Sequence, residues 1–221
     1  MGSVAFLFAG QGAQHPGMGK EFYEASSAFR AAFDAADLPF DLHRVCFDDP
    51  DGVLNQTEYT QPCMVAFACG VTAVLAQQGV KPAYVAGLSL GEYSALEAAG
   101  VFTAKQAIEL TAFRGKAMAE AAKGLACGMT AVLGLDRENC LPAASSCCGG
   151  LCADLQLQLP GPAGHWRRKG RSGQGRGGLQ SRPGARRCIP LNGDAARSTP
   201  GLMAPAGDAL AKRFAPNPLA K

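Results

Sequence analysis

The chain has 221 residues, of which 48% are hydrophobic and 18% charged, and its formal net charge is +3 at pH 7. This length suffices for one large domain or two small ones, and the composition is that of a globular protein with a buried core. The sequence has no run of about 18 apolar residues and no basic start before its first apolar stretch, so it predicts neither a transmembrane helix nor a secretion signal.

Cysteine usage gives a second constraint. The nine cysteines are odd in number and include no C-x-x-C pair, and the adjacent Cys147 and Cys148 do not have a zinc-binding spacing. We therefore expect free thiols, a cytoplasmic location, no metal site and no disulfide framework.

The net charge hides a division of the chain near Cys140. Residues 1–140 carry nine Lys and Arg against 15 Asp and Glu, whereas residues 141–221 carry 12 against three and contain no Glu. Gly, Arg, Pro and Ser are concentrated between Pro160 and Arg187. The two parts of the chain therefore need separate explanations.

Hydrophobic periodicity predicts alternating strands and helices in the first part, which favours a doubly wound parallel sheet. Gly79 should end one of the helices, and Thr103 with Gln106 forms a capping box that should begin another. In chain order, we expect a strand at Val4–Ala9, a helix at Glu21–Ala36, a helix from Pro62 to Gln78, a strand at Tyr84–Ala86, a helix from near Gly91, a helix from Thr103 to about Ala122, a strand at Thr130–Leu135 and a helix cap at Asp136.

The clearest motif is the G-x-S-x-G sequence at Gly87–Gly91, between a predicted strand and a predicted helix. A nucleophile elbow, the sharp strand-to-helix turn that exposes a reactive serine, requires this context. Ser89 is therefore the candidate nucleophile, and the backbone N–H of Leu90 is the candidate first donor of an oxyanion hole. The alternative is a glycine-rich turn with a capping serine.

A second turn, Gly10–Gln14, follows the first predicted strand. His15 stands where a dinucleotide-binding motif needs glycine, and Met18 stands where a P-loop needs lysine, which excludes both sites. The turn can still bring the backbone N–H of Gln11 to the top of the sheet as a second oxyanion donor.

Two further requirements of serine chemistry are less clear from the sequence. Arg114, in the helix that begins at Thr103, is either a solvated arginine or a fork that binds a substrate carboxylate. A serine nucleophile also needs a base. The chain has three histidines, and none lies in a context that identifies it as that base: His15, His43 and His165.

Together, these segments closely resemble the malonyl-CoA:acyl carrier protein transacylases, acyltransferases of fatty acid and polyketide synthesis. The matching blocks stand in the family's order, and they are Phe6–Gln14, Thr57–Pro62, Val85–Leu96, Arg114-Gly115 and Ala131–Leu135. The resemblance is nearly continuous over residues 3–139 and returns in two fragments, 185–192 and 202–214.

The resemblance implies an α/β fold, with an α/β-hydrolase-like parallel sheet core and an inserted ferredoxin-like subdomain. Residues 1–125 correspond to the N-terminal part of the core, and residues 126–188 to the position of the small subdomain. Residues 189–221 correspond to a truncated return to the core. The insertion should begin near Gly124–Gly128.

In that family, the elbow serine accepts a malonyl group from malonyl-CoA and passes it to the phosphopantetheine thiol of acyl carrier protein in fatty acid synthesis. Carried over, Ser89 is the nucleophile, Gln11 and Leu90 form the oxyanion hole, and Arg114 pairs with the malonyl carboxylate. The resemblance implies malonyl-CoA and acyl carrier protein as partners and no permanently bound cofactor. We expect no metal, no nucleic acid, no membrane and a monomer.

The sequence departs from the family where the family's histidine should stand. A Gly-Pro-Phe-His-Ser motif should follow the strand matched by Ile189–Asn192, but Gly193–Pro200 contains no histidine, and none stands near Ser198. The family's Asn-Tyr-Asn-x-Pro-Gly-Gln motif is also missing, and the chain stops before the family's final strand and helices.

A change of reading frame recovers both missing motifs. DNA that encodes Gln156–Gly164 can be read one base later as Asn-Tyr-Asn-Cys-Pro-Gly-Gln-Leu, and DNA that encodes Ala195–Pro200 can be read two bases later as Gly-Pro-Phe-His-Ser. We interpret roughly Cys140–Gly184 and Gly193–Gly201 as out-of-frame translation. This interpretation also explains the jump in charge, the loss of Glu and the surplus cysteines.

Three alternatives remain open at this point. An inactive frameshifted or truncated relative would keep the elbow and lack the base. A serine esterase would use the elbow without binding a carboxylate at Arg114. A disordered basic tail, with Trp166 beside Arg167 and Arg168, would bind single-stranded nucleic acid in a salt-sensitive way.

The reading-frame interpretation predicts the coding DNA. Resequencing from codon 135 to beyond codon 221 should restore one open frame that encodes Phe-His-Ser near residue 198 and continues past Lys221. DNA that confirms the present chain, or whose codons are incompatible with these shifts, would overturn the interpretation.

Overall fold

The structure is a computed structural model that describes residues 3–123, 127–133, 152–157, 163–168, 187–191 and 200–215. The chain divides into two compact units, one of Met1–Met118 with Asp208–Lys221 and one of Ala119–Gly207. Each unit has its own small sheet among the described residues.

A parallel pair of strands organises the first unit. β1 (Ala5–Phe8) pairs with β2 (Tyr84–Gly87) along its whole length, which confirms both predicted strands and their α/β arrangement. Parallel strands end at the same edge of a sheet, so the turns that follow β1 and β2 lie next to each other. The N–H of Leu88 in the second turn donates to the carbonyl of Phe8 at 3.1 Å.

The longest helix, α3 (Thr57–Gln77), begins five residues before the predicted start at Pro62. The reason is local: the carbonyl of Gln56 accepts hydrogen bonds from the N–H groups of Tyr59 and Thr60, so a complete turn forms before the proline. Pro62 therefore lies inside the helix, where it removes one backbone donor. Gly79, with φ of +76°, ends the helix as predicted.

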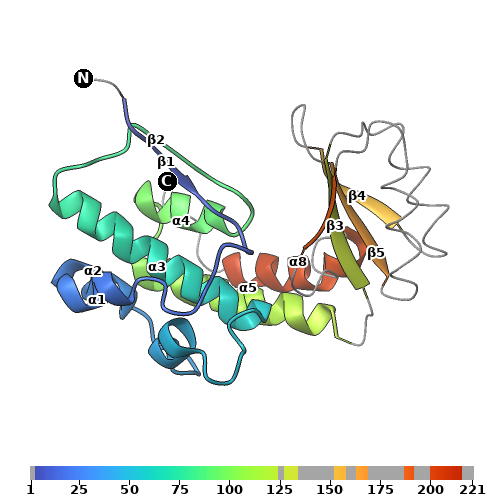
Figure 1. Cartoon of the computed structure of the whole chain (residues 1–221), viewed down its shortest axis with the longest axis horizontal. Helices are drawn as coiled ribbons and strands as arrows, with labels where there is room; N and C mark the ends of the chain where they lie inside the picture. The colour runs from blue at the N-terminus through green and yellow to red at the C-terminus, as the bar shows by residue number, and fades with distance from the viewer. Residues whose placement is uncertain are drawn as a thin grey trace. The chain divides into compact units, whose positions relative to one another are not determined.

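The α3 helix is a core helix of the first unit, although its length and apolar composition would also allow a membrane span. Nine of its residues are buried, and three of these are the polar residues Thr57, Thr60 and Gln61. Each of the three makes side-chain hydrogen bonds inside the unit. In Figure 1, α3 and α4 (Gly91–Ala98) lie on the same side of the β1–β2 pair.

The single helix predicted at Glu21–Ala36 is wrong. The structure has two helices there, α1 (Lys20–Ala25) and α2 (Ser27–Phe33), separated by an extended residue at Ser26. The Oγ atom of Ser26 accepts a hydrogen bond from the N–H of Phe29 at 3.2 Å, so the serine caps the second helix.

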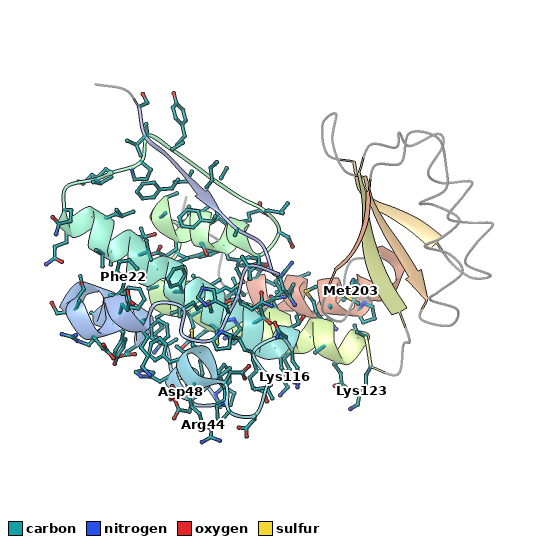
Figure 2. The ribbon with its side chains drawn as sticks, in the orientation of Figure 1. Phe22, Arg44, Asp48, Lys116, Lys123 and Met203 are labelled. Carbon is teal, nitrogen blue, oxygen red and sulfur yellow. The ribbon has the colours of Figure 1, made fainter. Side chains whose placement is uncertain are left out.

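The helix predicted to begin with a capping box at Thr103 is present. α5 (Ala104–Ala121) starts with the capping box, in which Gln106 Oε1 accepts from the N–H of Thr103 at 2.9 Å and Thr103 Oγ1 accepts from the N–H of Gln106 at 3.2 Å. A π-helical turn, η1 (Arg44–Asp48), lies before α3. Figure 2 shows Arg44 and Asp48 of η1, and Lys116 of α5, pointing away from the ribbon.

The second unit contains a four-stranded antiparallel sheet in the order β4-β5-β3-β6. This order of strands across the sheet, together with their antiparallel directions, is that of a ferredoxin-like sheet. It supports the predicted type of subdomain. The strand predicted at Thr130–Leu135 is present and begins three residues earlier. The strands are β3 (Cys127–Leu133), β4 (Cys152–Leu157), β5 (Ala163–Arg168) and β6 (Arg187–Leu191).

The last described element is the helix α8 (Pro200–Phe214), which contains the resembling fragment 202–214. The predicted cap at Asp136 and residues 124–126 at the expected start of the insertion lie outside the described residues. β4 and β5 fall in the basic segment that the nucleic-acid-binding alternative required to be disordered, and their pairing counts against that alternative.

Glu97 is a carboxyl group in the interior of the first unit, near the end of α4. Its Oε2 atom is buried and has no hydrogen-bond partner among the described residues. Burial raises the pKa of Glu97 to about 7, and a hydrogen bond with the Cys69 thiol of α3 opposes this rise. The ionised carboxylate therefore destabilises the fold.

We predict that Glu97 makes the stability of the chain fall as pH rises. The folded state keeps the proton up to a pKa of about 7, whereas an unperturbed Glu has a pKa of 4.5, so the free energy of unfolding decreases between these two pH values. Thermal melts from about pH 4 to about pH 8 should show this decrease. Glu97→Gln should remove it, whereas Glu24→Gln, at an exposed position of α1, should retain it. A Glu97→Gln variant that kept the wild-type pH dependence would contradict the burial of this group.

Candidate active site

The Gly87–Gly91 segment forms a sharp turn between β2 and α4. Ser89 has φ of +51°, in the left-handed region that a non-glycine residue adopts only when its surroundings impose it. A Cβ atom at Gly87 would lie 2.0 Å from the carbonyl carbon of Gly91, and one at Gly91 would lie 2.3 Å from the carbonyl oxygen of Phe8. These contacts show why both glycines are required, and the conformation is that of a nucleophile elbow.

Leu90 stands directly before α4, whose first residue is Gly91. Leu90 is buried, with 1% exposure, so the backbone that follows Ser89 is held by packing. The N–H groups at a helix start have no acceptors within the helix and carry partial positive charge, which favours an oxyanion. The Leu90 amide lies directly after Ser89, at the start of α4.

The turn after β1 packs against the elbow. A Cβ atom at Gly10 would lie 2.8 Å from the carbonyl oxygen of Leu88, so only glycine permits this close approach. Gln11 follows, and its side-chain Nε2 donates to Thr57 Oγ1 at 2.8 Å. The structure thus brings Gln11 and Leu90 to adjacent turns at one edge of the sheet.

The side chain of Arg114 reaches from α5 to the elbow. Its Nη2 atom donates to Ser89 Oγ at 3.1 Å, its Nη1 atom donates to Gln61 Oε1 at 2.8 Å, and its guanidinium carbon lies 5.4 Å from the centre of the Tyr93 ring. Burial lowers the pKa of Arg114, while Coulombic attraction to Tyr93 and Glu92 opposes the shift. Of the two interpretations that the sequence left open, the structure places Arg114 at the serine and not in solvent.

The charge of Arg114 is not neutralised by an ion pair among the described residues. The five ion pairs found there join Lys20, His43, Arg44, Lys105 and Lys123 to acidic side chains. The partners of Arg114 are instead a neutral amide, a hydroxyl and an aromatic ring. Since an arginine has five N–H donors, both Nη atoms and Nε retain hydrogens for a ligand. The site is therefore suited to an anionic group next to Ser89.

Three residues of this arrangement were not assigned a role from the sequence: Thr57, Gln61 and Tyr93. All three stand within blocks that carry the family resemblance, Thr57–Pro62 and Val85–Leu96. Their types gave no signal, since a buried threonine, glutamine or tyrosine in a helix is usually a matter of packing. Only the three-dimensional contacts connect them to Gln11 and Arg114.

The histidines do not supply a base in the residues described with side chains. His43 Nε2 lies 2.7 Å from Asp34 Oδ1, and its ring packs on Tyr23, Phe33 and Phe47. His15 has Nδ1 3.1 Å from the carbonyl oxygen of Pro16. It lines a cavity of about 440 Å³ between β1 and α3, whose other lining residues are mostly apolar. The side chain of His165 on β5, and the position near Ser198 expected to hold the family's histidine, lie outside the described residues.

Metal chemistry has no visible basis in the described part of the chain. Among its His, Cys, Asp and Glu residues, no three lie together in a way that could hold an ion. Cys46, Cys63 and Cys69 are buried free thiols. A hydrogen bond with Cys46, and then burial, raises the pKa of Cys63, while burial is the main cause that raises the pKa of Cys69.

Comparison with known proteins identifies the family. Residues 5–147 match the acyl transferase domain family. The malonyl CoA-acyl carrier protein transacylase of Salmonella typhimurium is 36% identical over 222 residues, which covers 97% of this chain and 70% of that protein. The chain belongs to the malonyl-CoA:acyl carrier protein transacylase family. The Bacillus subtilis transacylase is 41% identical over 140 residues, which covers 62% of this chain and 44% of that protein.

The transacylase fold is also found among solved structures. A malonyl-transacylase in complex with a type II PKS acyl-carrier protein superposes with a TM-score of 0.85 at 33% identity, over 97% of this chain and 70% of that chain. The chain therefore spans between 44% and 70% of the length of these transacylases.

Proposed function

We propose that this chain transfers a malonyl group from malonyl-CoA to the phosphopantetheine thiol of acyl carrier protein, through an ester on Ser89. The observation that carries the proposal is the contact between Ser89 Oγ and Arg114 Nη2 at 3.1 Å, made by a half-buried cation that has no acidic partner in the described residues. A serine beside an unpaired guanidinium is suited to acyl groups that end in a carboxylate.

In the proposed first step, Ser89 Oγ attacks the thioester carbonyl of malonyl-CoA. The serine proton passes to a base and then to the sulfur of CoA, which leaves as the thiol. The negative charge that forms on the carbonyl oxygen would accept hydrogen bonds from the backbone N–H groups of Gln11 and Leu90. In the second step, the carrier thiol attacks the ester, and Ser89 Oγ leaves and recovers a proton.

The free carboxylate of the malonyl group would pair with Arg114. Because Gln61 and Tyr93 hold the guanidinium without an ion pair, its positive charge is available to the substrate, although Glu92 also attracts it. An acetyl group lacks this carboxylate and would leave the partly buried cation unpaired. The site should therefore discriminate in favour of malonyl.

The base is the missing component of the proposal. Under the reading-frame interpretation, the frame-restored sequence has a histidine near residue 198. The chain with the present sequence lacks this histidine, so it would form the ester on Ser89 slowly. The match to the acyl transferase domain family ends at residue 147, close to the change in charge near Cys140, whereas the match to the Salmonella typhimurium transacylase covers 97% of the chain.

Acyl carrier protein is the proposed acceptor, because a structural relative was solved in complex with a type II PKS acyl-carrier protein. The three buried free thiols are consistent with a reducing compartment, and we propose the cytoplasm. Fatty acid synthesis is the proposed pathway.

The proposal predicts a malonyl ester on Ser89. After incubation of the full chain with malonyl-CoA, the mass of the intact protein should increase by one malonyl group on Ser89, and Ser89→Ala should abolish the increase. Addition of holo acyl carrier protein should remove the ester and produce malonyl carrier protein. Loss of the ester to water alone, with no transfer, would favour the esterase alternative, and no ester in either the literal or the frame-restored chain would contradict the proposal.

Arg114 should determine which acyl group is accepted. Arg114→Ala should reduce the rate of malonyl ester formation relative to acetyl ester formation by about 30-fold or more, since the loss of a buried charge partner costs at least about 2 kcal/mol. The matched control is Lys116→Ala, because Lys116 is an exposed cation two residues away on the same helix. Equal losses of malonyl and acetyl transfer in Arg114→Ala would contradict a carboxylate-binding role.

A further inference from the structure

The first turns of α3 contact two separate parts of the candidate active site. Thr57 and Gln61 are four residues apart and therefore lie on the same face of the helix. Both are buried, with exposures of 0% and 1%. Thr57 hydrogen-bonds Gln11, and Gln61 hydrogen-bonds Arg114.

The contact of Thr57 with Gln11 holds the turn after β1. Thr57 Oγ1 lies 2.8 Å from Gln11 Nε2 and 3.1 Å from Gln11 Oε1, so the hydroxyl both accepts and donates. The side chain of Gln11 is thereby fixed to the start of α3. Its backbone N–H, the proposed oxyanion donor, is free for a different role.

The contact of Gln61 with Arg114 sets the position of the guanidinium. Gln61 Oε1 accepts from Arg114 Nη1 at 2.8 Å, while Gln61 Nε2 lies 3.4 Å from Met118 Sδ. The amide nitrogen of Gln61 donates to the weak acceptor Met118 Sδ, so the amide oxygen faces Arg114. Gln61 therefore orients Arg114 and does not cancel its charge.

Close packing of α5 against α3 makes the arrangement rigid. A Cβ atom at Gly115, the residue after Arg114, would lie 2.7 Å from the carbonyl oxygen of Thr57 and 3.0 Å from the Cα atom of Glu58. The backbone of α5 thus rests on the start of α3, at the level where Thr57 and Gln61 project.

We infer that the start of α3 is a positioning platform that fixes the distance between the oxyanion hole and the carboxylate-binding arginine, with Thr57 acting through Gln11 and Gln61 acting through Arg114. The inference rests on the proposed function. Both are positioning residues, since neither reaches the reacting atoms.

The two residues should produce different defects. The full chain is treated with a fluorophosphonate probe, in which Ser89 Oγ gives up its proton and displaces fluoride from phosphorus, while the phosphoryl oxygen occupies the oxyanion hole. Affinities for malonyl-CoA and acetyl-CoA are measured by calorimetry. Thr57→Val should slow labelling about tenfold and change the malonyl-to-acetyl affinity ratio less than threefold. Gln61→Met should lower that ratio about tenfold and change the labelling rate less than threefold.

Each substitution has a matched control on the same helix. Thr72→Val removes a hydroxyl that bonds only the carbonyl of Ala68, at 2.8 Å, and should alter neither readout. Gln77→Leu changes an exposed glutamine at the end of α3 and should also alter neither. Thr57→Ser, which restores the hydroxyl, should recover the labelling rate. Gln61→Glu, which would pair with Arg114, should lower malonyl-CoA affinity further than Gln61→Met.

A purely structural role would give a different pattern. If Thr57→Val does not fold, Gln11→Met removes the same hydrogen bond from the exposed side, keeps the backbone N–H and should show the same labelling defect. Equal changes of both readouts in the Thr57 and Gln61 variants, or no change in either, would overturn the inference. If the wild-type chain is labelled at Ser89 and shows no preference for malonyl-CoA, the proposed function fails. The labelling rates of Thr57→Val and Thr72→Val would then still test whether Thr57 positions the oxyanion hole through Gln11.

Discussion

The candidate active site depends on the close approach of two turns at the carboxyl ends of β1 and β2. Parallel pairing brings the turns together, and Gly10, Gly87 and Gly91 allow backbone contacts that any side chain would prevent. Ser89 is held in a left-handed conformation as a consequence, and this conformation presents its hydroxyl at the edge of the sheet. Without these three glycines, neither the elbow nor the neighbouring Gln11 turn would form.

The electrostatics of the site depend on which groups contact the side chain of Arg114. Arg114 is partly removed from water, and the groups in contact with it are a hydroxyl, an amide oxygen and an aromatic ring, while Glu92 acts on it only by Coulombic attraction. A carboxylate at any of these places would have neutralised the arginine and competed with an anionic substrate. The packing therefore keeps a charge available at a cost in desolvation, as expected of a binding site and not of a structural ion pair.

Much of the first unit could be predicted from the sequence because its signals are local. The β1 and β2 strands, the capping box at Thr103 and the end of α3 at Gly79 all depend on residues a few positions apart. The predicted helix bounds were wrong at Ser26 and Pro62, where the same local signal is compatible with two different structures. A serine inside an amphipathic pattern capped a second helix, and a proline typical of a helix start was accommodated inside one.

The site itself was only partly predictable. The elbow has a sequence signature, but the partners of Gln11 and Arg114 are 46 and 53 residues away in the chain, and no local pattern could connect them. The second unit was the least predictable, because the composition of the chain changes near Cys140 and the periodicity of the first part does not continue there. Its four-stranded antiparallel sheet nevertheless has the strand order that the resemblance implied.

A crystal structure of the Ser89→Ala chain with malonyl-CoA, in which the substrate can bind and cannot react, would test most directly how the elbow and Arg114 hold the malonyl group. We predict that the free carboxylate pairs with Arg114, that the thioester oxygen faces the backbone N–H groups of Gln11 and Leu90, and that residue 89 keeps its positive φ. A malonyl group bound elsewhere, or an Arg114 side chain turned into solvent beside an occupied elbow, would contradict the central claim that this elbow and this arginine together select and hold the malonyl group.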